Sequence, residues 1–151
     1  MSKAKPFSVR EATHRDRFAL LDLSGDYFRE AALPMPFDPA HVSMTICEYT
    51  SASDRLALVL EISGQVSGFL FAGTYISPLA PVLVAQELAW WVDPGARGRS
   101  ARAMIPAYEA WARSQGCNLI SVAGRCDPRL ARFYRANGFA PIEDHFMKEL
   151  S

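Results

Sequence analysis

The sequence contains few cysteines, and they form neither a metal-binding pattern nor a disulfide framework. Its 151 residues include three, Cys47, Cys117 and Cys126, with no CxxC pair among them. A sparse and odd number of cysteines is typical of buried thiols in a reducing compartment. We therefore expect a cytoplasmic protein that holds no metal.

Long apolar runs and nucleotide-binding signatures are also missing. No stretch of about 18 apolar residues is present to span a bilayer. The first residues, MSKAKPFSVREAT, lack the apolar core of a signal peptide. Neither GxxxxGK[ST] nor GxGxxG occurs. Half of the residues are hydrophobic and 21% are charged, which is a globular composition. We expect residues 1–151 to form one domain outside the membrane.

Charge is unevenly distributed along the chain, although the net charge is zero. Residues 18–94 carry nine acidic residues and two arginines, whereas residues 95–138 carry eight arginines and two acidic residues. The basic part suggests an anionic ligand and the acidic part a cationic one, unless folding interleaves the two and cancels the field. Arginines at 125–135 could face a nucleic acid, but few aromatic residues lie between them and the pI of 6.8 argues against that class.

Apolar periodicity predicts alternating strands and helices. The expected strands are 7–11, 55–62, 66–76, 82–92, 118–123 and 139–150. The expected helices are 14–28, 39–49, a long helix that ends before Gly116, and 128–137. Near-continuous apolar character in 82–92 indicates burial on both faces. The order β-α-α-β-β-β-α-β-α-β describes a single α/β domain with a mixed sheet.

The long helix contains a proline at position 106. Proline has no N–H group to donate and its ring crowds the preceding turn, so the carbonyl of Arg102 loses its helical partner. We therefore expect a kink near Pro106.

The stretch VDPGARGRSARAM, residues 92–104, joins a predicted strand to this helix. A helix N-terminus leaves about four backbone N–H groups unpaired and carries roughly half a positive charge. Small residues let a phosphate approach those groups, and arginines can bind its oxygens. The pattern predicts either a phosphate site or an ordinary basic helix start. The residues concerned are Arg97, Gly98, Arg99, Ser100, Ala101 and Arg102.

A second stretch, RLARFYRANGFAPI, residues 129–142, combines an aromatic pair with a glycine-terminated helix and a following strand pattern. Alone it indicates simple packing. Together with ELAWWVDPGARGRSARAM, residues 87–104, it resembles the GNAT superfamily of acyl-CoA-dependent N-acetyltransferases. The predicted element order agrees with that family across nearly the whole chain. The resemblance implies a mixed, mostly antiparallel central sheet flanked by helices.

The resemblance also implies a binding site for acetyl-CoA. Backbone N–H groups from Arg97 to Arg102 would hold the pyrophosphate, and the strand around Leu88, Trp90 and Val92 would pair with the pantetheine arm. Asp127 stands where the family often has an asparagine that contacts pantetheine. The chain departs from the family pattern at Ser100 and Arg102, which replace the usual glycines.

Two residues are candidates for the chemistry. Tyr134 falls on the family's tyrosine, which commonly gives a proton to the departing thiolate, and core packing is its structural alternative. Glu87 lies on the central strand before the acyl site and could remove the proton of the amine. Its alternative is an acid at a strand edge, paired with an arginine.

The resemblance implies an enzyme that transfers an acetyl group from acetyl-CoA to an amine by direct attack on the thioester. The acidic first half favours a cationic acceptor, either a small amine or a protein amine. The rival hypothesis is a coenzyme-binding or protein-interaction module of the same fold without turnover. A homodimer is compatible with either hypothesis.

Overall fold

A computed structural model describes residues 5–124 and 127–150 of the chain. Its elements are β1 (Phe7–Glu11), the 3₁₀ turn η1 (His14–Asp16), α1 (Arg17–Ala31), α2 (Pro39–Ser51), β2 (Arg55–Ile62), β3 (Gln65–Ile76), β4 (Leu83–Val92), the 3₁₀ turn η2 (Pro94–Ala96), α3 (Arg99–Arg102), α4 (Met104–Ser114), β5 (Leu119–Ser121) and α5 (Pro128–Ala136). No helix within these residues is long and apolar enough to cross a membrane.

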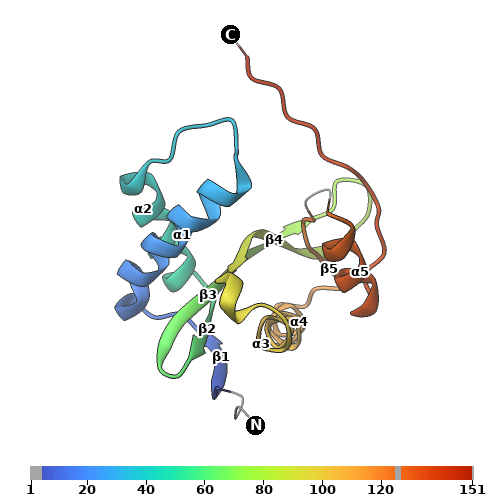
Figure 1. Ribbon diagram of the computed structural model, residues 1–151. Coiled ribbons are helices and arrows are strands. Elements are labelled where there is room, and N and C mark those ends of the chain that lie inside the picture. Colours follow the sequence, from blue (N-terminus) through green and yellow to red (C-terminus); the bar gives the residue numbers. More distant parts are fainter. Residues whose placement is uncertain (1–4, 125–126, 151) are drawn as a thin grey trace.

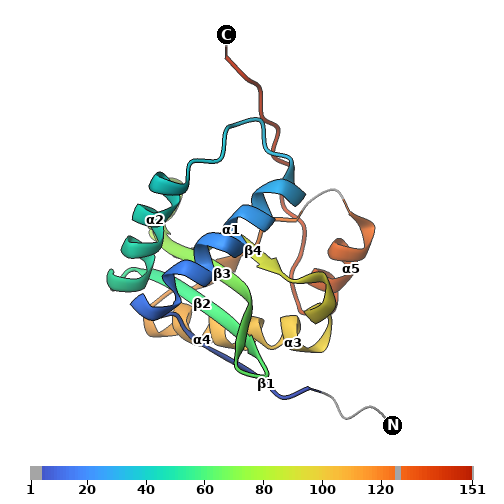
Figure 2. The same ribbon diagram turned by 60° about the vertical axis from the view of Figure 1, so that its left-hand side comes forward.

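One sheet in the order β1-β2-β3-β4-β5 forms the centre of the molecule (Figure 1). The first four strands are antiparallel neighbours, and β5 pairs in parallel with β4. Helices α1 and α2 cover one face, α3 and α4 cover the other, and α5 lies beside β5 (Figures 1 and 2). The predicted mixed, mostly antiparallel sheet flanked by helices is confirmed.

The core consists of two apolar layers because helices cover both faces of the sheet. Along β2, Leu56 and Leu58 pack toward α4, where Tyr108 is fully buried. Val59 points the other way, toward Leu20 of α1. Side chains of a strand alternate between faces. A strand buried on both faces is therefore apolar at almost every position, as the sequence of 82–92 predicted for β4.

Most helix boundaries follow the expected signals. The Asp38 carboxylate accepts hydrogen bonds from the backbone N–H groups of Ala40 and His41 at 2.9 and 3.0 Å, so it caps α2. Gly116 follows α4 with φ of 81°, the left-handed conformation that ends many helices. The kink expected near Pro106 is a break at Ala103, which separates α3 from α4.

The expected strand at 139–150 is wrong. These residues follow α5 without regular secondary structure, and no strand among the described residues lies next to the free edge of β5. An alternating pattern produces a strand only where an edge accepts its hydrogen bonds. In Figure 1 the segment instead leads away from the sheet to the C-terminus.

The expectation of buried thiols also fails in part. Cys47 is exposed on α2 and Cys117 is half-buried, and both are free cysteines. Cys126 lies outside the described residues.

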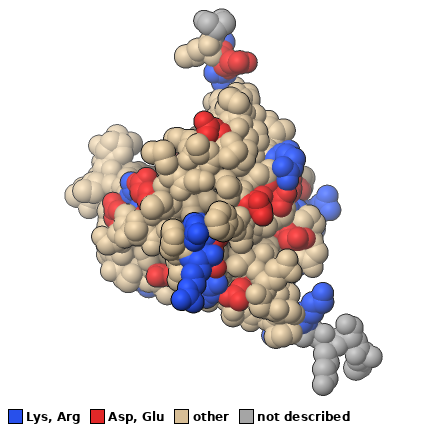
Figure 3. Space-filling view, turned by 90° about the vertical axis from the view of Figure 1, so that its left-hand side faces the viewer, with Lys and Arg blue, Asp and Glu red and all other residues tan. Residues whose placement is uncertain are grey.

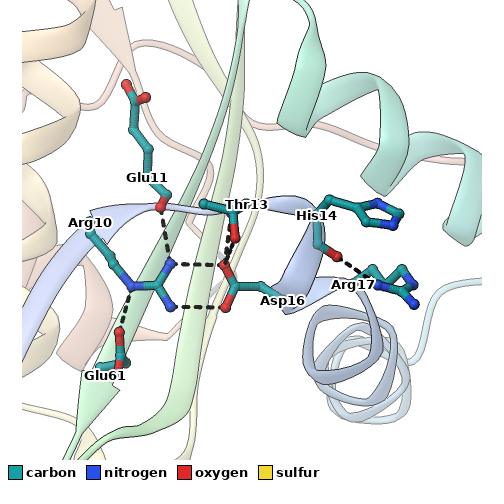
Figure 4. A network of polar contacts seen from close by, with 7 residues as sticks. All are labelled: Arg10, Glu11, Thr13, His14, Asp16, Arg17 and Glu61. Atoms are coloured by element: carbon teal, nitrogen blue, oxygen red, sulfur yellow. Dashed lines mark hydrogen bonds and ion pairs between the residues drawn. The ribbon is translucent and has the colours of Figure 1, made fainter.

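A hydrogen-bonded ion cluster joins β1, β2 and the start of α1 (Figure 4). The Arg10 guanidinium donates to both carboxylate oxygens of Asp16 at 2.8 and 2.9 Å, and through Nε to Glu61. The Asp16 carboxylate also accepts from the Thr13 backbone N–H at 2.7 Å. Arg10 lowers the pKa of Asp16, against the opposing effect of burial. The Asp16 side chain is only 8% exposed, so its charge depends on these partners.

Asp16→Asn should lower the free energy of unfolding by about 2 kcal/mol at pH 7, because the amide leaves Arg10 without its bidentate partner. Since the pKa of Asp16 is lowered by folding, the stabilisation is present above the unfolded pKa of about 4 and is lost as the pH falls through the folded value. Urea denaturation at several pH values measures it. Asp22→Asn, an exposed acid on α1, is the control and should change stability by less than about 0.5 kcal/mol. Equal effects of the two changes at pH 7 would contradict this role.

Candidate active site

The site begins where β4 and β5 separate. The two strands pair only at Val84–Leu119, Ala85–Ile120 and Gln86–Ser121. On its other side, β4 has an irregularity, because Ala89 pairs with Phe71 and Glu87 pairs with Ala72, which leaves Leu88 between them without a partner. An extra residue of this kind bends a strand and increases its twist. From Leu88 to Val92, the side of β4 toward β5 is therefore open.

Glu87 fills the point of divergence. Its side chain comes from β4 beyond the last β4–β5 pair, and its Oε2 accepts a hydrogen bond from the backbone N–H of Ala123 at 2.8 Å. The residue is 5% exposed. Burial raises the pKa of Glu87 to about 7, against the lowering effect of the Ala123 hydrogen bond. This carboxyl can therefore both accept and release a proton near neutral pH.

Tyr134 reaches the backbone of the same residue, Ala123, from α5. Its hydroxyl donates to the carbonyl of Ala123 at 2.9 Å. Burial is the main cause of the raised pKa of Tyr134, and the negative charge of Glu87 is the next. The phenol therefore keeps its proton at neutral pH. The two residues predicted for the chemistry, Glu87 and Tyr134, are thus linked through the N–H and C=O groups of one residue, Ala123.

Trp90 packs between β4 and α5. Its ring centroid lies 6.1 Å from those of Phe133 and Tyr134, and its Nε1–H points to Met104 Sδ at 3.3 Å. Val92, two residues further, is buried, and its carbonyl accepts from Arg97 Nε at 2.8 Å. Side chains of β4 thus line the site, and the backbone of β4 from Leu88 to Val92 lies along its open side.

The loop after β4 leads into two consecutive helices, α3 and α4. Gly98 has φ of 108°, a left-handed value that an L side chain rarely adopts. Because α3 begins at Arg99, the first N–H groups of this helix have no partner within it. Ser100 Oγ donates back to the Ala96 carbonyl, and Ala101 is buried in the core.

The three arginines of this loop differ in what they contact. Arg97 forms an ion pair with Glu30 of α1 at 2.6 Å, and Arg102 Nε donates to Asn137 Oδ1, after α5, at 3.0 Å. Arg99 is exposed, and its side chain has no hydrogen bond or ion pair with any residue in 5–124 or 127–150. The bond from Arg102 joins the two sequence stretches that carried the resemblance. Arg99 is the arginine whose charge is available to a ligand.

Asp127 begins α5. Its Oδ1 accepts a hydrogen bond from the Arg129 backbone N–H at 2.8 Å, with Pro128 at the first helical position. The side chain is 47% exposed. Its carboxylate therefore acts as a helix cap, and its position beside the site follows from that of α5.

Two features of the site had no signal in the sequence. Ala123 contributes only its backbone, so no side-chain pattern could reveal it. Tyr108 donates to the Ser121 carbonyl at 3.0 Å and fixes the end of β5 against α4, a long-range contact that no local pattern predicts. Among the described residues, no three His, Cys, Asp or Glu side chains group in a way that could hold a metal ion.

Folding interleaves the two oppositely charged parts of the chain. Glu30 from the acidic part accepts from both Arg97 and Trp91 Nε1, the latter at 2.6 Å. Within the acidic part itself, Asp26 pairs with Arg29. On the face covered by α1 and α2, acidic and basic side chains lie among a large uncharged area (Figure 3). The acidic excess predicted from the sequence therefore forms no single-sign surface on this face.

Solved structures with the same fold include several acetyltransferases. A glucosamine-6-phosphate N-acetyltransferase from Arabidopsis thaliana has a TM-score of 0.75 at 16% identity, with 97% of this chain and 100% of that chain covered. An aminoglycoside acetyltransferase from an uncultured soil metagenomic sample has a TM-score of 0.76 at 14% identity, with 96% and 97% covered. A predicted acetyltransferase from Clostridium acetobutylicum, solved with acetyl-CoA, has a TM-score of 0.78 at 12% identity, with 95% and 96% covered.

The sequence itself gives the more specific match. No curated protein matches the chain. The sequence model of the Acetyltransferase (GNAT) family, however, matches residues 18–139, which include β4, the loop after it and α5. The fold and this match agree, and the chain belongs to the GNAT family of acetyltransferases.

Proposed function

We propose that the protein transfers an acetyl group from acetyl-CoA to the nitrogen of an amine. The observation that carries the proposal is the link from Glu87 through Ala123 to Tyr134, at the point where β4 and β5 diverge. It puts a carboxyl with a pKa near 7 and a protonated phenol on the backbone of one residue, beside an open strand edge.

The coenzyme would bind along the open side of β4 and the loop that follows. Backbone groups from Leu88 to Val92 face no strand there and suit the amide groups of a pantetheine arm. The first N–H groups of α3 and the Arg99 guanidinium suit the pyrophosphate, because both favour negative charge. Arg97 and Arg102 would hold the loop in shape through Glu30 and Asn137.

The reaction proposed is direct attack of the amine on the thioester carbonyl. An alkylammonium with a pKa near 10.4 must first lose a proton, and Glu87 would accept it, directly or through a water. The carbon–nitrogen bond forms, the carbon–sulfur bond breaks, and Tyr134 would give its phenolic proton to the departing thiolate. Backbone N–H groups of β4 would polarise the carbonyl oxygen.

The amine acceptor is proposed as a class only. A cationic acceptor was predicted from the acidic first half, yet Asp26 and Glu30 pair with arginines and Asp38 caps α2. These carboxylates therefore offer little charge to a cation, and the acceptor has to be found by screening small amines and peptides. A cytoplasmic location is proposed on the sparse cysteines, of which Cys47 is free and exposed.

Release of free thiol from acetyl-CoA tests the proposal, with and without a panel of amines. We expect at least one amine to accelerate release over the rate without acceptor, with one acetylated amine formed per thiol. Binding of acetyl-CoA without release on any amine would instead support the rival, a coenzyme-binding module without turnover. No binding of acetyl-CoA at all would contradict both.

Arg99→Ala should weaken acetyl-CoA binding by roughly five- to tenfold, because it removes one charge-assisted contact to phosphate, about 1 kcal/mol. Calorimetric titration measures the dissociation constant. Arg15→Ala removes the same charge from an exposed position before α1 and should leave the affinity unchanged. Equal affinities for wild type and Arg99→Ala would exclude Arg99 from the phosphate site.

Glu87→Gln should lower kcat and remove the part of the pH–rate profile that rises near pH 7. The amide keeps an acceptor for the Ala123 N–H but cannot take a proton. The limb governed by the amine's own ionisation, near pH 10, should remain. A profile that still rises near pH 7 in Glu87→Gln would rule out this residue as the base.

The same substitution has a consequence for stability. Because burial raises the folded pKa of Glu87 to about 7 from the ordinary 4.5, ionising it costs folding free energy, and wild-type stability falls as the pH rises between these values. Glu87→Gln should therefore melt at a higher temperature than wild type at pH 8 and at the same temperature at pH 4. A melting temperature at pH 8 no higher than that of wild type would contradict the raised pKa.

Tyr134→Phe should lower kcat by up to roughly 10²-fold with nearly unchanged acetyl-CoA affinity, because only the proton donor is lost. Tyr108→Phe is the matched control, since its hydroxyl also donates to a carbonyl of the β5 segment, at Ser121, but from the core. It should reduce stability and leave kcat near wild type. Equal kcat losses in both variants would indicate that Tyr134 acts only by packing.

A further inference from the structure

A hollow lies between helices α1 and α2. Leu21 of α1 and Ile46 of α2 are the more buried residues of its apolar lining, and Ile46 is only 2% exposed. Phe18 also lines it and is 66% exposed. The hollow has a volume of about 170 Å³, which is below the roughly 300 Å³ at which pockets for drug-sized ligands begin. It therefore suits only a small ligand.

The space stays open because α2 presents short side chains to the larger ones of α1. Besides Ile46, the residues of α2 that line the hollow are Ser43, Cys47 and Thr50. The Ser43 hydroxyl donates to the Pro39 carbonyl, and the Thr50 hydroxyl donates to the Ile46 carbonyl, both at 2.8 Å. Both hydroxyl protons are thus used within α2, so this side offers neither of them to a ligand.

The opposite side of the hollow carries two hydrogen-bond donors, the side chains of His14 and Arg17. The Arg17 guanidinium lies 4.3 Å from the centroid of the Phe18 ring and donates to the His14 carbonyl at 3.1 Å. Figure 4 shows both side chains on the side of the turn away from the carboxylate of Asp16, which is paired with Arg10. These contacts hold the guanidinium beside the hollow.

No carboxylate neutralises this guanidinium within the part of the chain that the structure describes. Arg17 forms no ion pair there, and no acidic residue lines the hollow. The arginine has five N–H groups, of which the His14 carbonyl accepts one. The hollow therefore combines apolar walls with a positive charge whose remaining donors are available.

We propose that the hollow binds a small molecule that joins a carboxylate to a short apolar chain. The carboxylate would accept two hydrogen bonds from Arg17, the bidentate arrangement that a guanidinium favours, with the His14 ring as a further donor. The apolar chain would lie on Leu21 and Ile46 and cover the exposed ring of Phe18, which removes apolar surface from water.

The hollow is separate from the candidate active site. None of Glu87, Ala123 and Tyr134 lines it. In Figure 1, α1 and α2 lie on one side of the molecule, and β5 and α5 lie on the other. A ligand in the hollow leaves the opening between β4 and β5 free, so the proposal does not depend on the function proposed above.

NMR titration of the full chain with hexanoate tests the proposal, with acetate and 1-hexanol as probes that each carry one half of the ligand. We expect saturable shifts at residues 14–21 and 43–50, with a dissociation constant on the order of 1 mM for so small a ligand. Acetate and 1-hexanol should bind at least roughly fivefold more weakly, because each lacks one set of contacts. No saturable shift at these residues, or equal binding of either half, would overturn the proposal.

A charge variant tests the role of Arg17. Arg17→Gln should weaken hexanoate binding by roughly five- to tenfold and leave 1-hexanol binding unchanged, because only the charge-assisted contact is lost. Arg15→Gln is the matched control, since Arg15 is exposed in the same turn but does not line the hollow. It should bind hexanoate as wild type does. Wild-type affinity in Arg17→Gln would overturn the proposal.

A filling variant tests the place of the apolar chain. Cys47→Leu puts a larger side chain into the hollow and should abolish the binding of both hexanoate and 1-hexanol. Cys47→Ser keeps the size of the side chain and should still bind hexanoate. An unchanged circular dichroism spectrum shows that each variant is folded. A folded Cys47→Leu that binds hexanoate with wild-type affinity would overturn the proposal, whether or not the protein acetylates amines.

Discussion

The separation of β4 from β5 is the constraint on which the site depends. Three residue pairs hold the two strands together, and the unpaired Leu88 marks the place where β4 bends away. Beyond that place the backbone that follows β5 would have been left without partners from a neighbouring strand. The Glu87 carboxylate and the Tyr134 hydroxyl supply them, through the N–H and C=O groups of Ala123. The same hydrogen bonds that satisfy the divergent strand therefore bring an acid and a phenol together.

This arrangement also explains the unusual state of Glu87. A carboxylate 5% exposed and held by one backbone N–H is poorly compensated, so its pKa rises to about 7. An ion pair with an arginine, the alternative that the sequence left open, would have lowered it. Two of the three loop arginines have other partners: Arg97 contacts Glu30, and Arg102 contacts Asn137. These two arginines therefore hold the loop in place and do not neutralise the Glu87 carboxyl between β4 and β5.

Local signals predicted most of the fold, and long-range contacts account for what they missed. Asp38 caps the start of α2 and Gly116 ends α4 through contacts within one turn, so the sequence predicted both helix ends. The apolar run of 82–92 likewise predicted a strand covered on both faces. Two motifs located the loop and α5. The bulge at Leu88, the peptide of Ala123 and the pairing of Glu30 with Arg97 depend on which strands and helices become neighbours. The strand expected at 139–150 has the right alternation, but the segment leads away from the free edge of β5. An alternating pattern shows that a segment can form a strand, but it does not show which strand it will pair with.

NMR chemical shifts of the backbone amide groups, followed during titration with acetyl-CoA, test the proposed coenzyme site most directly, because they report where the coenzyme binds. We expect shifts concentrated at Leu88–Val92, at Gly98–Ala101 and at Ala123, with little change on α2. Shifts that centre instead on the hollow lined by His14, Phe18 and Cys47 between α1 and α2, or no shifts at all, would contradict it.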